Sequence, residues 1–342
     1  MRGGVSLLSI LLLSLSLIFT ACSDGGDDNS NPSPTLPANQ GTNPVDKILG
    51  EGSTGTGEET DAKSIKLISY DDSDHGDYAT VLELKNDGTA TMHTRKNTED
   101  YPPYSEFEYS YAENEIYMRL SKCTSDITYD DGLLYTYDEL ISQANEYFEM
   151  ENYKKALEQQ FNEYQNKEWF QNEYPDCNTY KKYEDLKIKE GGFKSLDEMI
   201  ADEKKYLTYC YDMYFSPKVT YTYEIKSGKM TLTEEFTGIM NILLTNCRYE
   251  NIDYNDNNYV HSLGAGSGYI TLTTRDYDYY TVSFDKSKKE AVLCNSSDKT
   301  DKITATYKED IPNATVTVTI NDERYRGEYP CKFEGSTYTQ EV

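Results

Sequence analysis

Hydrophobic and polar residues alternate along most of the chain after its first 63 residues, which is the pattern of β-strands with one buried face. Thr80–Lys85 leads through Asn86-Asp87-Gly88 into Thr89–His93, and Asp-Gly between two alternating runs is a strong signal for a hairpin. A second hairpin follows, with Phe107–Tyr111 on its first arm and Ile116–Leu120 on its return. The pattern therefore predicts short antiparallel strands joined by tight turns.

The second hairpin recurs 112 residues later at the same phase. The matched positions are Phe107, Tyr109, Tyr111, Met118 and Leu120 in the first copy and Val219, Tyr221, Tyr223, Met230 and Leu232 in the second. A looser third copy lies between Ile303 and Ile320. This recurrence indicates a duplicated β-meander unit, with similarity between generic hairpins as the alternative.

Further strands are expected at Ile270–Thr274, Tyr280–Phe284 and Ala291–Cys294. Counting these, about a dozen short strands predict an α+β fold that is mainly β, built as an antiparallel meander. Such a meander either closes into a barrel or packs as a sandwich.

Between the first two hairpin copies, hydrophobic residues change to helical spacing over residues 135–214. Thr136-Tyr137-Asp138-Glu139 and Ser195-Leu196-Asp197-Glu198 have the pattern of capping boxes, which begin helices. We therefore expect an antiparallel β domain over residues 64–342 that is interrupted by a helical insertion at 135–214. Because each predicted helix is amphipathic, the insertion should pack on itself or on the barrel.

The first 22 residues have the pattern of a secretion signal. Arg2 precedes an apolar run, Val5–Ile18, that is shorter than the roughly 20 residues of a membrane-spanning helix. Phe19-Thr20-Ala21-Cys22 ends the run and resembles the lipobox of bacterial lipoproteins, although Phe19 stands where that family usually has leucine. The resemblance implies a signal peptide at 1–21 and acylation of Cys22 by a diacylglycerol and a further chain such as palmitate. The alternative is an ordinary secretory signal in which Cys22 is incidental.

Residues 22–63 are rich in Asp, Asn, Gly, Ser, Thr and Pro. This composition buries too little apolar surface to fold, so we expect a disordered tether with a reach of about 35 Å. The implied acyl chains would anchor the protein to the outer membrane without a membrane-spanning helix. Ser23–Asp28 is similar to the surface-export signal of some lipoproteins, which leaves both the periplasmic face and the cell surface open.

The chain has 60 acidic and 33 basic residues and a net charge of −27. Nucleic-acid binding depends on clustered cations that neutralise phosphates, so no nucleic-acid partner is expected. Anionic lipid should also repel this charge. We therefore expect membrane lipid to be reached only through the acylated Cys22.

Six cysteines remain besides Cys22, in a chain directed to an oxidising compartment, and they predict one to three disulfides of undetermined pairing. They are Cys123, Cys177, Cys210, Cys247, Cys294 and Cys331. Neither a Cys-x-x-Cys spacing nor a histidine at zinc-ligand spacing occurs among them. We expect no metal site and no cofactor.

Catalytic motifs are missing from the sequence. The three histidines form no metal-ligand pair, and the glycine cluster Gly264–Gly268 precedes a predicted strand instead of the helix that a phosphate loop or a nucleophile elbow requires. We therefore expect a protein that is not an enzyme. A glycoside hydrolase stays an alternative, because among 60 acidic residues some pair of carboxylates must lie at a suitable separation.

Tyrosine is unusually frequent, at 33 residues. Exposed tyrosine rings stack on sugars and are common on binding surfaces, so Tyr277, Tyr279 and Tyr280 are the candidate ligand-binding residues. The alternative is that tyrosine, a good strand former with one polar end, lines partly hydrated sheet faces.

A strand ending in Asn-Asp-Gly, a Tyr-x-Tyr strand, a tight turn and an alternating return strand together resemble the lipocalin-like domains of bacterial lipoproteins. The resemblance covers Thr80–Leu120, Val219–Thr233 and Ile270–Ile320. It departs from the family at Ser64–Tyr70, where many lipocalins have Gly-x-Trp. The resemblance implies a small up-and-down barrel with an apolar cavity or a packed interior, and it assigns no functional residue.

These observations predict a membrane-anchored, non-enzymatic lipoprotein that binds a small apolar or glycan ligand. One alternative is a structural or protein-interaction module of the cell envelope that contacts a partner protein through its helical insertion. The other is a glycoside hydrolase, which would need a cleft with two carboxyl groups, one of them with a raised pKa.

Overall fold

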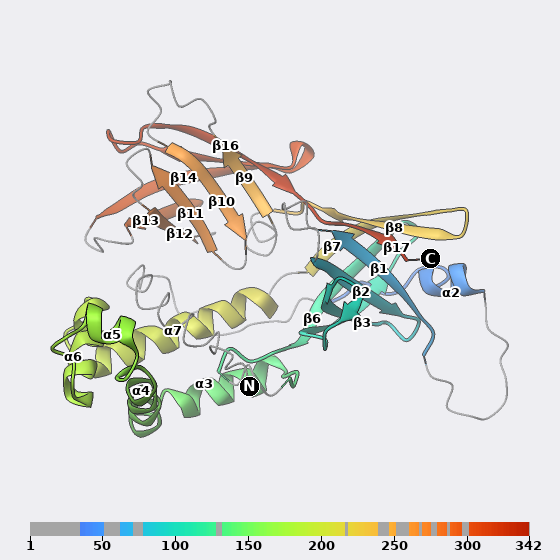
Figure 1. Cartoon of the computed structure of the whole chain (residues 1–342). Helices are drawn as coiled ribbons and strands as arrows, with labels where there is room; N and C mark the ends of the chain where they lie inside the picture. The colour runs from blue at the N-terminus through green and yellow to red at the C-terminus, as the bar shows by residue number, and fades with distance from the viewer. Residues whose placement is uncertain are drawn as a thin grey trace.

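The computed structural model describes residues 35–50, 62–70, 78–127, 132–215, 218–238, 246–250, 260–266, 269–274, 279–285, 288–295 and 301–341. Two antiparallel β-structures and a group of helices make up this part of the chain (Figure 1). The expected mainly β, α+β fold is confirmed, and its meander closes as a barrel. The signal peptide and Cys22 lie outside the described residues. None of the helices described is both long enough and apolar enough to cross a membrane.

The first barrel is a ring of eight antiparallel strands. They are β1 (Ser64–Tyr70), β2 (Tyr78–Lys85), β3 (Thr89–Lys96), β5 (Ser105–Tyr111), β6 (Glu115–Cys123), β7 (Lys218–Lys226), β8 (Lys229–Glu235) and β17 (Thr337–Gln340). β2 pairs with both β1 and β3, and β17 pairs with both β1 and β8, which closes the ring. The short β4 (Glu99–Asp100) continues the line of β5 along β3.

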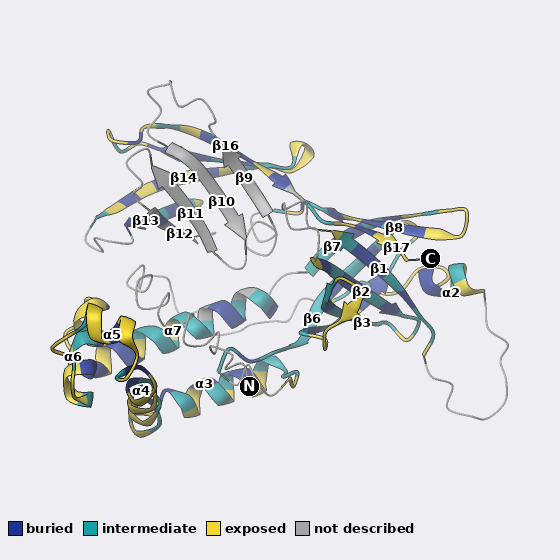
Figure 2. Cartoon of the chain, viewed as in Figure 1, coloured by how far each residue is buried: buried dark blue, intermediate teal, exposed yellow. Residues whose placement is uncertain are grey.

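The interior of the first barrel is filled by alternate residues of every strand in the ring. Leu67 lies opposite Leu82, which lies opposite Met92, so these side chains share the inner face. The buried strand residues of this core are Ile65, Leu67, Leu82, Leu84, Ala90, Tyr109, Ile116, Met118, Tyr221, Tyr223, Met230, Leu232 and Tyr338. Figure 2 shows the resulting alternation of buried and more exposed residues along the strands. The interior is packed with side chains.

The two hairpins that recur in the sequence are neighbours in this one barrel. They correspond to β5–β6 and β7–β8, and β6 pairs directly with β7. Their separation of 112 residues arises because the helices lie between β6 and β7. The recurrence therefore marks successive parts of one meander, and only the third copy, in Ile303–Ile320, belongs to the other barrel.

Short turns and long insertions leave the first barrel at opposite ends. The tight turns after β2, β5 and β7 lie at one end, the plain end, where Gly88 and Gly228 adopt positive φ values of 88° and 78°. The connections after β6 and β8 leave from the other end, the insertion end, and contain the helices and the second barrel. Figure 1 shows both insertions on the same side of the first barrel.

Residues 35–50, which fall within the tether expected at 22–63, are ordered and pack on the plain end, so the expected disorder does not hold for this part. Helix α2 (Pro44–Leu49) begins after Asn43, whose side chain accepts a hydrogen bond from the Val45 N–H. Val45 is fully buried in the barrel core. The N–H of Gln40 also donates to the Tyr111 carbonyl over 2.9 Å. Burial of Val45 offsets the chain entropy that the polar composition alone leaves uncompensated.

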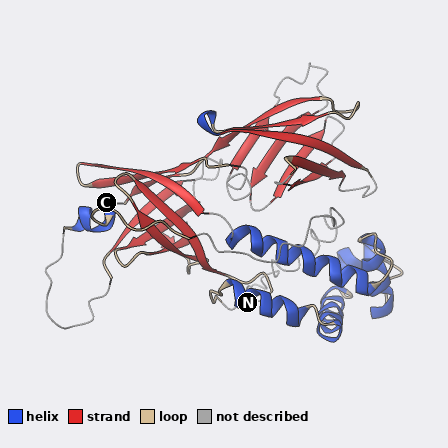
Figure 3. Cartoon of the chain, turned by 180° about the vertical axis from the view of Figure 1, so that it is seen from behind, coloured by secondary structure: helices blue, strands red, loops and turns tan. Residues whose placement is uncertain are grey.

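The helices lie between β6 and β7, where the sequence predicts a helical insertion. They are α3 (Tyr137–Tyr147), α4 (Met150–Tyr164), α5 (Glu168–Glu173), α6 (Tyr180–Glu190) and α7 (Leu196–Phe215). The predicted capping box at Thr136 is present, since its side chain and that of Glu139 each accept from the other residue's backbone N–H. Most of the buried residues of α4 to α7 form one cluster, and α3 also packs with the end of α7. Figure 3 shows these helices as a separate group beside the barrels, called here the helical subdomain.

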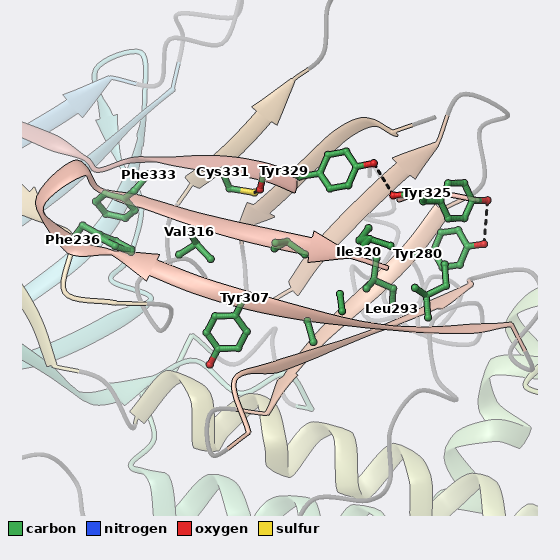
Figure 4. Packing of buried hydrophobic residues seen from close by; sticks show 14 residues of the cluster. Phe236, Tyr280, Leu293, Tyr307, Val316, Ile320, Tyr325, Tyr329, Cys331 and Phe333 are labelled. Carbon is green, nitrogen blue, oxygen red and sulfur yellow. Dashed lines mark hydrogen bonds between the residues drawn. The ribbon is translucent and has the colours of Figure 1, made fainter. Parts of the chain in front are cut away.

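The second barrel is a closed ring of eight antiparallel strands in sequence order. They are β9 (Asn246–Glu250), β10 (Val260–Gly266), β11 (Tyr269–Thr274), β12 (Tyr279–Asp285), β13 (Glu290–Asn295), β14 (Lys302–Asp310), β15 (Thr315–Ile320) and β16 (Gly327–Glu334), with the short η2 (Ile311–Asn313) before β15. Figure 4 shows part of its core, in which Phe236, from the connection after β8, packs beside Phe333. Only Gly335 and Ser336 separate β16 from β17 of the first barrel.

Five of the six cysteines fall in the described part of the chain with their side chains, and no disulfide joins any two of them. They are Cys123, Cys177, Cys210, Cys294 and Cys331. The expectation of one to three disulfides is therefore not borne out among these five. They are distributed over both barrels and the helical subdomain, and Cys247 lies where side chains are not described.

Candidate functional site at the rim of the first barrel

Of the three predicted ligand-binding tyrosines, only Tyr280 has a described side chain, because Tyr277 and the Tyr279 side chain lie outside the described part. Tyr280 is 1% exposed and belongs to the core of the second barrel. Its hydroxyl donates to Asp301 Oδ2 over 2.6 Å. The same hydroxyl lies 3.3 Å from the Tyr325 hydroxyl (Figure 4). A ring buried in this way cannot stack on a ligand at the surface, so the expected exposed face does not include Tyr280.

The most exposed tyrosines among the described residues cluster at the insertion end of the first barrel. Tyr70 is 67% exposed, Tyr78 46% and Tyr101 49%. Tyr70 ends β1 and Tyr78 begins β2, while Tyr101 follows β4. These residues form an aromatic edge, and none of them is among the binding residues predicted from the sequence.

The strand register places Tyr78 and Tyr101 on the inner side of this edge. The Tyr101 N–H donates to the Thr94 carbonyl over 2.8 Å, and Thr94 lies opposite Thr80 on β2. Thr80 shares its face with Leu82, which points into the barrel. Tyr78 is two residues before Thr80, so both rings stand over the mouth of the barrel, with Cα atoms about 12 Å apart from strand spacing and rise. Tyr70 pairs with Ala79 and faces outward.

Lys96 completes the edge between the two rings. It lies opposite Tyr78 in the β2–β3 register and opposite Glu99 of β4. Its Nζ stands 4.9 Å from the centre of the Tyr78 ring, a cation–π contact. The following residue, Asn97, takes a positive φ of 55°, which allows the tight turn into β4. Tyr78, Lys96 and Tyr101 together are called the rim.

A proline pair explains why Tyr101 is half-exposed at the end of the barrel and is not buried within it. Asp100 pairs with Arg95 and Ser105 with Met92, so the chain between them has extra residues compared with β3. Pro102 and Pro103 fill this bulge, and proline has no N–H for the ladder. The bulge therefore leaves Tyr101 half-exposed at the end of the barrel, while Tyr104 points into the interior.

Tyr104 points into the barrel below the rim, toward Tyr221 and Tyr338. Burial raises the pKa of Tyr104 to about 12, and its hydroxyl is hydrogen-bonded to the side chain of Thr80. Tyr221 and Tyr338 lie deeper, with ring centres 6.2 Å apart, and burial raises the pKa of Tyr221 well above its usual value. These inner tyrosines and Val45 of α2 fill the barrel between the rim and the plain end.

An ionic cluster on the outer face fixes the chain that carries Tyr101. Asp100 is hydrogen-bonded to the Arg95 guanidinium and pairs with Lys66 Nζ over 2.8 Å, and the Arg95 bond holds the pKa of Asp100 well below its usual range. Arg95 also pairs with Glu341. Because Asp100 precedes Tyr101 directly, this cluster limits the positions available to the Tyr101 ring.

Two of the described carboxyl groups have a pKa raised by burial. Burial raises the pKa of Asp126, and it raises that of Glu203 to about 7. Neither is among the residues, all between Lys181 and Leu196, that line a groove at the junction of α6 and α7. Within the described residues, no group of three or more His, Cys, Asp or Glu side chains could hold a metal ion.

The sequence contains one signal for the rim that hydrophobic periodicity does not reveal. Tyr101-Pro102-Pro103-Tyr104 interrupts an alternating run with two prolines, which is typical of a bulge beside a binding surface. No comparable sequence pattern predicts that Tyr78 is exposed, because its exposure depends on its position as the first residue of β2.

Comparisons with protein-family models, with curated proteins and with solved structures find no match for this chain.

Proposed function

We propose that this chain is a lipid-anchored, non-enzymatic protein of the bacterial outer membrane that binds a glycan at the rim of its first barrel. The observation that carries the proposal is the pair of half-exposed rings, Tyr78 and Tyr101, above the partly buried Tyr104. Exposed tyrosine rings stack on the apolar faces of sugars, and their hydroxyl groups bind the sugar's polar edge.

The packed interior favours a ligand on the rim over one inside the first barrel. Side chains from all eight strands fill that interior, and Val45 of α2 covers its plain end. A small apolar ligand would have to displace several of these side chains, and the free energy of their packing would be lost. The Lys96 ammonium, 4.9 Å from the centre of the Tyr78 ring, adds a positive charge beside this aromatic surface.

The proposal keeps Cys22 as the site of acylation and the outer membrane as the location, on either its periplasmic or its surface face. The N-terminal segment meets the first barrel at the plain end, through Gln40 and Val45. An anchor before this segment would therefore be joined to the barrel at the end opposite the rim. The up-and-down order of both barrels supports assigning them to a lipocalin-like class.

A binding assay on soluble polysaccharides tests the glycan site. In native gels that contain a panel of such polysaccharides, the wild-type protein should be retarded by at least one, and Tyr78→Ala/Tyr101→Ala should migrate freely. Each stacked ring contributes about 1 kcal/mol, so the double variant should weaken binding roughly 20-fold or more. Tyr70→Ala is the matched control, because Tyr70 is more exposed but faces outward.

Equal retardation of the wild type and the double variant would exclude the rim as the glycan site. Retardation by none of the polysaccharides would count against glycan binding itself. The anchor is tested separately by labelling cells with radioactive palmitate, where Cys22→Ser should abolish incorporation into this protein.

A further inference from the structure

The helical subdomain has an open groove of about 530 Å³ where α6 ends and α7 begins. Ile188, Phe193 and Leu196 form its apolar floor, and Lys189 and Lys194 stand along it. The connection between α6 and α7 lies at the end of the subdomain farthest from the first barrel (Figures 1 and 3). The groove is therefore remote from the rim.

Local sequence explains how an apolar side chain comes to lie in this groove. Gly192 has a positive φ of 74°, and the Phe193 N–H donates to the Ile188 carbonyl over 2.9 Å. This is the Schellman arrangement that ends a helix and brings the flanking hydrophobic residues into contact. A Cβ atom on Gly191 would come within 2.4 Å of the Phe193 ring, so only glycine allows the ring to lie there.

The two acidic residues that line the groove, Glu184 and Asp185, are paired with a lysine. Lys181 Nζ lies 2.6 Å from Glu184 Oε1 and 2.9 Å from Asp185 Oδ1. Glu190 is 3.5 Å from Lys187 Nζ. On α7, the Glu198 carboxylate accepts the backbone N–H of Lys194 over 2.8 Å. The ion pairs with Lys181 and Lys187 reduce the negative potential along the groove, whereas Glu198 keeps its full charge.

Two cations remain unpaired along the groove. Lys189 and Lys194 are exposed, and neither ammonium group has a hydrogen-bond or ion-pair partner within the part of the chain that the structure describes. Tyr137–Phe215 contains 18 acidic residues against 10 lysines, so a cation without an acidic partner is available to an anionic ligand. An apolar floor with a free cation at Lys189 and another at Lys194 fits a ligand that has both apolar and anionic groups.

We propose that this groove docks an acidic peptide segment of a partner protein through one bulky apolar side chain. The apolar residue would pack between Ile188 and Phe193, and carboxylates on either side of it would meet Lys189 and Lys194. A groove of several hundred cubic ångströms accommodates such an anchor, and apolar anchors flanked by charges are a common mode of peptide recognition. This site is independent of the glycan rim.

Fluorescence anisotropy with the full mature chain in detergent micelles tests the proposal. The probe is a fluorescein-labelled peptide, Glu-Glu-Leu-Phe-Asp-Glu, at low ionic strength. We expect saturable binding that weakens at least tenfold in Lys189→Glu/Lys194→Glu and weakens with added salt. Replacing Leu-Phe in the probe by Ala-Ala should also weaken binding at least tenfold.

The matched control is Lys154→Glu/Lys155→Glu, which makes the same charge change at two exposed lysines of α4. This variant should bind the probe within twofold of the wild type, and Tyr78→Ala/Tyr101→Ala should bind it unchanged. The proposal is overturned if the control pair weakens binding as much as the groove pair. It is equally overturned if a probe with lysine in place of its acidic residues binds as tightly, or if the acidic probe does not bind at all.

Discussion

Buried tyrosine hydroxyls bonded to carboxylates recur in this fold, and the surroundings decide the charge of each carboxyl group. The Tyr280 hydroxyl donates to Asp301, which also receives two hydrogen bonds from Arg324, and this guanidinium lowers the pKa of Asp301. The Tyr153 hydroxyl donates to Glu203 over 2.6 Å, but burial dominates there and raises the pKa of Glu203 to about 7. Asp301 is thus held charged at neutral pH, whereas Glu203 keeps its proton to a higher pH than an ordinary carboxyl group.

Glu203 should make the stability of the helical subdomain depend on pH. Its folded-state pKa of about 7 exceeds the ordinary value of 4.5, so its proton is bound more tightly when folded. The resulting stability is fully present below about pH 4.5 and is lost as the pH rises through about 7. Glu203→Gln should therefore raise the free energy of unfolding at pH 8, by an amount on the order of 2 kcal/mol, and should flatten its pH dependence.

Thermal unfolding followed by far-ultraviolet circular dichroism at pH 5 and pH 8 measures this effect. Glu151→Gln, at an exposed position of α4, is the matched control and should leave the pH dependence of the wild type intact. An identical pH dependence in wild type and Glu203→Gln would contradict the assignment to Glu203.

Sequence patterns distinguish inner from outer strand positions better than they distinguish exposed from buried tyrosines. Alternation alone places Tyr109 and Tyr221 on one face of their strands, and both lie in the barrel core. The same residue type is buried at Tyr280 and half-exposed at Tyr78. That difference depends on partners far away in the chain, such as Asp301, and on where a strand begins, so local composition could not predict it.

At the scale of elements, the hairpins were predictable because their information is local. The Asn-Asp-Gly turn and the alternating arms correspond to β2 and β3, and residues 107–120 form β5 and β6. The pairing of β17 with β1 and β8 joins residues about 100 to 270 positions apart, and no local pattern contains it. Closure of the first barrel therefore could not be predicted from hydrophobic periodicity alone.

Helix α2 shows a different limit of prediction from sequence. Residues that favour the beginning and the end of a helix are present, but the helix itself is only six residues long. Asn43 is a good N-cap residue, Pro44 suits the first helical position and Gly50 follows the helix. These signals occur within a polar, glycine-rich segment whose composition favours disorder. The deciding contribution is the burial of Val45 in a barrel end that only the folded structure provides.

Val45→Ala should destabilise the first barrel and detach the segment before it. Removing two methyl groups from a fully buried side chain costs roughly 2 kcal/mol, including the cavity that remains. We expect a lower midpoint in urea unfolding and faster proteolysis near α2. Leu49→Ala is the matched control, since Leu49 in the same helix is 45% exposed and its truncation should change stability by less than about 0.5 kcal/mol. Equal effects of the two changes would argue against α2 as a plug of the barrel.

At the scale of the whole molecule, one barrel is inserted into a connection of the other. The chain leaves the first barrel after β8, forms the complete second barrel and returns through β16 into β17. β8 and β17 are adjacent antiparallel strands, with Thr233 opposite Thr337. The second barrel therefore occupies the place of an ordinary hairpin loop, a nesting that strand patterns in the sequence do not reveal.

Excision of the second barrel should leave the rest folded. When residues 236–334 are replaced by Asn-Gly, these two residues form a hairpin turn that links Glu235 of β8 to Gly335 before β17. The core of the first barrel lies in a separate cluster from that of the second, so we expect a soluble protein with a cooperative thermal transition. Differential scanning calorimetry measures it. An aggregated protein, or one without a transition, would show that the first barrel depends on the second.

The attachment of the N-terminal segment to the plain end also has a mechanical consequence. If a partner pulls on the helical subdomain while Cys22 is held, tension enters near Gln40 and leaves through β6 and β7 at the opposite end. Such a force runs along the strands, across hydrogen bonds that lie perpendicular to it. Several bonds must then shear together before any strand slips, whereas a pull applied at one end alone would unzip them singly. The 16 residues between Cys22 and Asn39 can take up at most about 60 Å of extension before that load reaches the barrel.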